Sequence, residues 1–238
     1  DPQVAVQITR CLAKAIDYDM TKGHELAKLL MQRNELMVRR AMADVLTRLF
    51  RRLGDEALPF YYQLKDDSDS DILAAVSTTS ADLRFLDVDM WAENLVELSN
   101  HELPVVRRNL VPSLREYFET FPDDTRKLLP VMWQDGDEVV RTRMRELLIK
   151  MSDISSTQFG ARITDLNQHG CDLSALWRLM DARRKGSSEA WKSWLSGEGE
   201  MPETIETMRH VSTMQAPEEL PDLSEALETL DEELGFLD

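Results

Sequence analysis

Residues 34–50 read NELMVRRAMADVLTRLF, and residues 100–118 read NHELPVVRRNLVPSLREYF. Val38 and Val106 occupy the same place in these two segments. The same register recurs at a constant interval over the first two thirds of the chain, at Val4, Val38, Ile72, Val106 and Val140. In each copy apolar residues follow at intervals of three and four, which is the spacing of one helix face. The sequence therefore predicts amphipathic helices in a repeating unit whose length is the step from Val4 to Val38.

Asp or Asn stands a few positions before the β-branched residue in every copy, where its side-chain oxygen can cap a helix N-terminus. Shorter apolar helices are predicted between these helices, at residues 25–33, 58–64, 91–98 and 125–133. In the third copy, Ser77-Thr78-Thr79-Ser80 is expected to interrupt the helix, because these residues prefer capping and turn roles. A helix hairpin cannot bury its own apolar face, so neighbouring hairpins must stack. The predicted fold class is all-α, an α-solenoid of stacked hairpins.

The pattern of Asp or Asn, a short gap and then Val-Arg resembles HEAT repeats. It is seen at Val38-Arg39, Val106-Arg107 and Val140-Arg141, and the resemblance covers about residues 1–155. Pro112 and Pro130, in or near helices, also suit that family. Ala5 and Leu73 replace the arginine in the first and third copies, which leaves the row incomplete. A 34-residue period also fits tetratricopeptide repeats, but their Trp, Leu-Gly, Tyr and terminal Pro signature is absent.

The charge of the chain is concentrated at one end. The formal net charge is -16, yet residues 1–197 hold 31 acidic and 27 basic side chains, while residues 198–238 hold 13 acidic side chains and one base. Glycine and proline around residues 197–202 are typical of a linker. We therefore expect HEAT-like repeats at 1–154, a helical cap at 155–197 and an acidic linker with a tail helix at 198–238. The cap is predicted to contain helices at 173–184 and 188–195.

The acidic end carries an apolar pattern of its own. Its leucines follow intervals of three and four, at Leu220, Leu223, Leu227, Leu230, Leu234 and Leu237. This spacing predicts an amphipathic helix with an acidic outer face. Leu223, Leu227, Leu230 and Leu234 are candidate partner-binding residues, expected to contact a hydrophobic groove. The groove belongs either to a partner or to this chain itself, and the sequence leaves both alternatives open.

Basic side chains of the repeats are the other candidate partner-binding residues: Arg39, Arg40, Arg107, Arg108, Arg141 and Arg143. The resemblance to HEAT repeats implies that their helices line a concave face. Stacked hairpins lie about 10 Å apart, so such a row suits phosphates or an acidic helix. The resemblance also implies a structural role, in which the Val-Arg arginine pairs with the capping Asp of an adjacent repeat. Pairing is favoured at the Val-Arg positions, and both roles stay open for the other arginines.

Cofactor, metal and catalytic motifs find little support in the sequence. Residues 67–71 read DSDSD like the start of a calcium loop, but Ile72 and Thr78 stand where Gly and Glu are needed. The four histidines are scattered, and no Gly-rich phosphate loop or nucleophile motif is present. HEAT-like repeats also occur in DNA glycosylases for alkylated bases, which have an aromatic and acidic cleft. Trp91 beside Asp87 and Asp89 is the one feature of this sequence that resembles such a cleft. We predict no cofactor, no metal and no enzyme activity.

The sequence thus predicts a non-enzymatic protein-interaction scaffold, part of a larger protein or complex, that binds a helix or extended segment of a protein partner. The alternative is a nucleic-acid-binding solenoid whose acidic tail competes with phosphate for the arginines. No stretch approaches the roughly 18 apolar residues that a membrane span needs. Cys11 and Cys171 lie far apart and suggest no disulfide framework, which favours a cytoplasmic location, or a nuclear one in a eukaryote.

Overall fold

The computed structural model describes residues 1–203, and this part of the chain contains helices and no β-strand. The α-helices are α1 (Pro2–Tyr18), α2 (Met20–Met31), α3 (Leu36–Leu53), α4 (Leu58–Lys65), α5 (Ser70–Thr79), α6 (Val88–Ser99), α7 (Pro104–Thr120), α8 (Pro122–Trp133), α9 (Glu138–Ile154), α10 (Ser156–Gln168), α11 (Ser174–Arg183) and α12 (Ser187–Leu195). Two short 3-10 helices, η1 (Gly54–Ala57) and η2 (Ser80–Phe85), follow α3 and α5. The all-α prediction is confirmed for the described residues.

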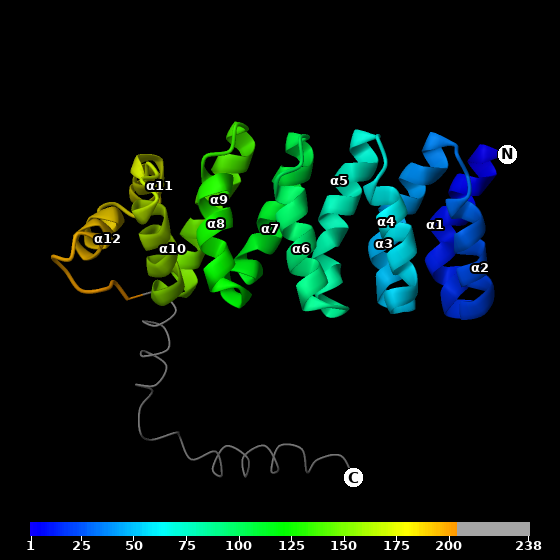
Figure 1. The fold of residues 1–238 in the computed structure, drawn as a ribbon, viewed down its shortest axis with the longest axis horizontal. Helices are drawn as coiled ribbons and strands as arrows, with labels where there is room; N and C mark the ends of the chain where they lie inside the picture. Colours follow the sequence, from blue (N-terminus) through cyan, green and yellow to red (C-terminus); the bar gives the residue numbers. More distant parts are fainter. Residues whose placement is uncertain (204–238) are drawn as a thin grey trace, which may run out of the picture.

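The helices form one row with two layers, running from α1 and α2 at one end to α11 and α12 at the other (Figure 1). In the first layer α1 packs on α3, α3 on α5, α5 on α7, α7 on α9, and α9 on α11. The helices α1, α3, α5, α7 and α9 begin at Pro2, Leu36, Ser70, Pro104 and Glu138, at the same constant interval as the recurring β-branched residue. The second layer consists of α2, α4, α6, α8 and α10, each packed beside its neighbours in the first. The predicted period therefore sets the spacing of the first layer.

Burial explains why the β-branched residue recurs in each first-layer helix. Val38, Ile72, Val106 and Val140 are all 0% exposed. Val4, the equivalent residue of α1, is 55% exposed, because α1 is the terminal helix of the row. The recurring residue is thus buried wherever another first-layer helix precedes its own. Burial of apolar surface contributes a free energy of about 25 cal/mol per Å², and it is the main force that stacks the row.

The interruption expected in the third copy is present. Helix α5 has 10 residues and ends at Thr79, whereas its neighbours α3 and α7 have 18 and 17 residues. Hydroxyls of the interrupting segment donate to backbone carbonyls three or four residues earlier: Ser77 and Thr78 to Ala74, Thr79 to Ala75, and Ser80 to Ser77. Such bonds compete with the helical pattern, and the chain continues as η2.

Helix α10 was not predicted from the sequence. Its N-terminus is capped by Ser155, whose hydroxyl accepts the backbone N–H of Gln158. The ring of Trp194 packs against α10 at Gly160. A Cβ at this position would approach that ring to 2.9 Å, so glycine leaves room for it. Several predicted boundaries also differ. Helix α2 spans Met20–Met31 instead of residues 25–33, and α6 and α8 each begin three residues earlier than predicted.

Residues 198–203 lie outside the helices but are held against the end of the row. The backbone N–H of Glu198 donates to the Ser193 carbonyl at 2.9 Å. The Ser156 hydroxyl donates to the carbonyl of Pro202, and the methyl of Met201 lies beside Gly160. The path of the chain is therefore defined up to Glu203, and the predicted tail helix lies outside the described residues. None of the described helices combines the length and the apolar composition required to cross a bilayer.

Candidate interaction groove

The Val-Arg arginines form ion pairs with carboxylates that precede the next first-layer helix. Arg39 lies 2.7 Å from Asp67, and Arg107 donates two hydrogen bonds to Asp135, at 2.7 and 2.9 Å. Both carboxylates are nearly buried, with side-chain exposures of 8% for Asp67 and 6% for Asp135. The sequence favoured pairing with the capping Asp of an adjacent repeat. Arg39 and Arg107 do pair with an Asp of the next repeat, but that Asp lies two residues before the N-cap.

In the second and fourth copies another arginine follows, and it forms a second pair. Arg40 donates to both oxygens of Asp69, at 3.0 and 2.7 Å, and Arg108 donates to both oxygens of Asp137. Asp69 and Asp137 are also the N-caps of α5 and α9. Hydrogen bonds from Arg40 and Arg108, together with the backbone N–H groups of the caps, hold the pKa of each carboxyl well below its usual range. The residues 67–71, which resembled a calcium loop, thus serve in capping and ion pairing.

Each Val-Arg arginine also binds the loop before its own helix. Arg39, Arg107 and Arg141 donate to carbonyls in these loops, which belong to Asn34, His101 and Asp135 respectively. Arg141 has no carboxylate partner in a following repeat among the described residues, and it instead forms an ion pair with Glu138 one turn earlier. Five of the six predicted arginines therefore have carboxylate partners within the chain.

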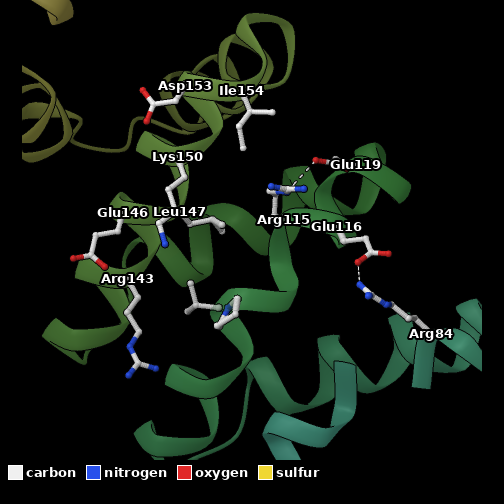
Figure 2. A pocket seen from close by; sticks show the side chains of 12 residues that line it. Arg84, Arg115, Glu116, Glu119, Arg143, Glu146, Leu147, Lys150, Asp153 and Ile154 are labelled. Atoms are coloured by element: carbon white, nitrogen blue, oxygen red, sulfur yellow. Dashed lines mark ion pairs between the residues drawn. The ribbon is translucent and has the colours of Figure 1, made fainter. Parts of the chain in front are cut away.

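Arg143, the sixth, lines a hollow of about 990 Å³ on the first layer, between α7 and α9. Figure 2 shows Arg143, Glu146, Lys150 and Asp153 of α9 on one side, with Arg115, Glu116 and Glu119 of α7 on the other. Leu147 lies between the two sides (Figure 2), and Val111, Pro112 and Ile154 also line this hollow. Its walls are thus charged and its floor is apolar.

Two basic groups of this hollow are neutralised within the chain. Arg84 pairs with Glu116, and Arg115 lies 3.4 Å from Glu119 (Figure 2). Lys150 is exposed and forms no ion pair among residues 1–203. Arg143 is also exposed, and its one bond within that range goes to the Arg108 carbonyl at 2.7 Å.

A second hollow, of about 670 Å³, adjoins the first at Asp153, which lines both. Its apolar lining comes from Ile149, Met180 and Trp191, and its basic lining from the run Arg183-Arg184-Lys185 after α11. Arg183 lies 3.3 Å from Asp153, whereas Arg184 and Lys185 are exposed without ion pairs among the described residues. We call the two hollows together the α9 groove.

The α9 groove differs in charge from the rest of the chain. Seven basic and five acidic side chains line it, in a protein whose net charge is -16. Four of the basic residues have no ion-pair partner among residues 1–203: Arg143, Lys150, Arg184 and Lys185. Sequence reasoning found the first of these and missed the other three. The run of three bases at 183–185, unusual in an acidic chain, was the available signal.

The residues considered for chemistry lie apart from this groove. Trp91 is 1% exposed and packs against Tyr117 and Phe121, with ring centroids 6.0 and 6.3 Å away. Asp87 caps α6 by accepting the N–H of Met90 at 2.9 Å. No group of His, Cys, Asp or Glu side chains within the described part is arranged to hold a metal ion. Trp91 is therefore a core residue and Asp87 a capping residue.

Leu223, Leu227, Leu230 and Leu234, the other candidate partner-binding residues, lie outside the described residues. A comparison of the sequence with protein-family models and with curated proteins finds no match. We therefore infer the function from the geometry of the α9 groove.

Proposed function

We propose that this chain is a non-enzymatic, HEAT-like α-solenoid scaffold that binds a helix or an extended segment of a protein partner in the α9 groove. The observation that carries this proposal is the groove itself, an apolar floor bordered by four basic side chains that lack ion-pair partners among residues 1–203. The constant step between first-layer helices and the Val-Arg ion pairs support the HEAT-like assignment.

Because of the same ion pairs, we propose binding in the groove and not along the predicted arginine row. A guanidinium already bonded to a carboxylate and to loop carbonyls, as in Arg107, has few donors left for a ligand. Separating such a pair also costs the desolvation of both charges. We therefore assign Arg39, Arg40, Arg107 and Arg108 to the fold and Arg143 to binding.

The groove also defines the chemistry of the segment that it binds. Apolar side chains on one face fill the floor formed by residues such as Leu147 and Ile154, and acidic side chains on the flanks meet Lys150, Arg184 and Lys185. An amphipathic helix with acidic flanks has this distribution, and helix-in-groove binding is a common mode of peptide recognition.

The test is a selection of helical peptides from a random library on the immobilised full-length chain. Selected peptides are expected to be acidic and leucine-rich, and to lose at least about tenfold in affinity for Lys150→Glu, which is about 1.4 kcal/mol. Lys127→Glu is the matched control, because Lys127 lies on α8 in the second layer with a side-chain exposure of 85%. A library that yields no binders, or binders that lose equal affinity in both variants, would overturn the proposal.

Nucleic-acid binding, the alternative, is tested with the same protein. A row of phosphate contacts would make affinity fall steeply with salt, with a log–log slope near the number of contacts. The measurement is a titration of duplex DNA at about 50 and 200 mM salt. Nucleic-acid binding would replace the scaffold proposal if the affinity fell by roughly a thousandfold between the two and depended on Arg107 and Arg39.

A further inference from the structure

We propose that residues 220–237 of this same chain occupy the α9 groove and compete with the partner for it. This inference rests on the proposed function, since it concerns the same groove. Three observations carry it: where the described chain ends, how far the remaining chain reaches, and how charge and apolar residues match.

The described chain ends at the groove. After Gly197 the backbone is bonded at Glu198, beside α12, and at Pro202, beside α10. Pro202 and Glu203 then line the second hollow, together with Arg183 and Trp191. The remaining chain therefore starts at the rim of the groove and needs no path across the molecule to enter it.

The length of the remaining chain suits this site. Sixteen residues separate Glu203 from Leu220, and a flexible linker of that length has a root-mean-square span of about 20–24 Å. A helix over residues 220–237 would be about 27 Å long at 1.5 Å per residue. The two hollows of the α9 groove lie between α7 and the end of α11, with α9 between them, a span of about 20 Å for helices packed about 10 Å apart. Segment and groove are therefore comparable in length.

Charge and apolar pattern also match. Residues 220–237 contain six acidic side chains and no basic one, opposite a groove with four basic residues that have no ion-pair partner among residues 1–203. The six leucines of this segment recur at intervals of three and four and would form one face of a helix. With that face on Leu147, Ile154 and Met180, the acidic residues lie toward Lys150 and Lys185 at the rim.

Tethering makes this contact effective even when the intrinsic affinity is low. A short flexible linker presents its segment at an effective concentration of millimolar order. A partner segment must then outcompete the tail, so the groove selects ligands that resemble residues 220–237 but bind more tightly.

The test is amide hydrogen exchange of residues 220–237 in the full-length protein. We expect these amides to exchange at least about tenfold more slowly than in a variant with Leu223, Leu227, Leu230 and Leu234 changed to Ser. The protection should also fall in the groove variant Lys150→Glu/Lys185→Glu. It should persist in Lys28→Glu/Lys127→Glu, which changes the net charge equally on α2 and α8. Far-UV circular dichroism checks that each variant remains helical.

Several outcomes would overturn the inference. Equal exchange rates in the wild type and the leucine variant would show that the segment is not docked. Equal loss of protection in both lysine variants would show a general charge effect. Protection that rises with protein concentration would place the tail in the groove of a second copy.

A second measurement separates this inference from the proposed function. If the tail competes, the peptides selected on the full-length chain should bind the leucine variant at least about tenfold more tightly than the wild type. Equal affinity would overturn tail docking while the groove remained a binding site. A groove that bound no peptide in the leucine variant would overturn the proposed function itself.

Discussion

Two junctions between first-layer helices carry an Arg–Asp ion pair. At the one between them, which we call the apolar junction, a leucine stands in place of the arginine. Arg39 and Asp67 join α3 to the loop before α5, and Arg107 and Asp135 join α7 to the loop before α9. At the α5–α7 junction the equivalent positions, one repeat after Arg39 and Asp67, hold Leu73 and His101. Arginine and acid are absent together at this junction, and we therefore expect the pair to be exchangeable as one unit. Arg141, the last arginine of the row, has His169 in place of the acid and pairs with Glu138 instead.

His101 keeps one role of the acid, which is to accept a backbone hydrogen bond in the loop before the helix. Its Nδ1 accepts the N–H of Leu103 at 3.1 Å, as the Asp67 and Asp135 carboxylates accept the N–H two residues later. The acceptor that shapes the loop before the helix is thus present at all three junctions, while the ion pair is present at two. This agrees with the general finding that a buried pair and a well-packed apolar contact contribute similarly to stability, whereas half of a pair is costly.

The largest effect is expected from placing half of the pair in the apolar junction. Leu73→Arg removes a side chain that is 6% exposed and introduces a guanidinium with no carboxylate opposite. We expect a loss of about 3–4 kcal/mol in the free energy of unfolding. Adding His101→Asp should restore at least about half of this loss, because Asp supplies the carboxylate and keeps the acceptor for Leu103. Urea denaturation measures both variants, and a double variant no more stable than Leu73→Arg would contradict the equivalence of the junctions.

The next effect comes from removing one partner of the more buried of the two Val-Arg pairs. Asp135→Asn keeps an acceptor for the Asp137 N–H but leaves Arg107, whose side chain is 14% exposed, without its countercharge. The expected cost is about 2–3 kcal/mol. Asp67→Asn should cost less, because the side chain of Arg39 is 29% exposed and water can solvate it. A reversed order of the two urea midpoints would show that burial does not set the strength of these pairs.

A smaller effect is expected when both partners are replaced together. Arg107→Leu with Asp135→His gives the charged junction the residues of the apolar one. We expect a cost below about 1.5 kcal/mol, less than that of Asp135→Asn alone. The comparison of single and double variants forms a thermodynamic cycle that yields the coupling energy of the pair. A cost equal to the sum of the two single substitutions would mean that the pair is not a unit.

The sequence predicted the elements whose signals are local. The starts of α5 and α9 follow from apolar spacing and from the capping residues Asp69 and Asp137. The cap expected from Asn34 and Asn100 is wrong, because α3 and α7 begin after Glu35 and Leu103 without a side-chain cap. Helix α10 was missed because Gly160, Arg162 and Asp165 interrupt its apolar pattern. They are buried by contacts made only in three dimensions, such as Trp194 on Gly160 and Arg126 near Asp165.

The candidate site was predictable only in part for a similar reason. Arginine rows are visible in the sequence, and so is the shared spacing that joins Arg39 to Asp67 and Arg107 to Asp135. The repeated interval from arginine to aspartate is sufficient to identify the paired arginines. The α9 groove has no such signal, because its second half forms beyond the last repeat, where Arg184 and Lys185 line the same hollow as Ile149 of α9.

The smallest effect is expected in the pH dependence of stability. Asp69 and Asp137 have pKa values lowered in the folded protein, first by the hydrogen bonds from Arg40 and Arg108. A carboxyl with a lowered pKa contributes stability that is complete above its unfolded pKa of about 3.9 and is lost as the pH falls toward the folded value. Unfolding midpoints should therefore be level between about pH 7 and 5 and fall below about pH 4. Asp137→Asn should lower the plateau and make the fall shallower, because one of the titrating groups is gone. A curve for Asp137→Asn with the same shape as that of the wild type would show that the acid limb arises outside the ion pairs.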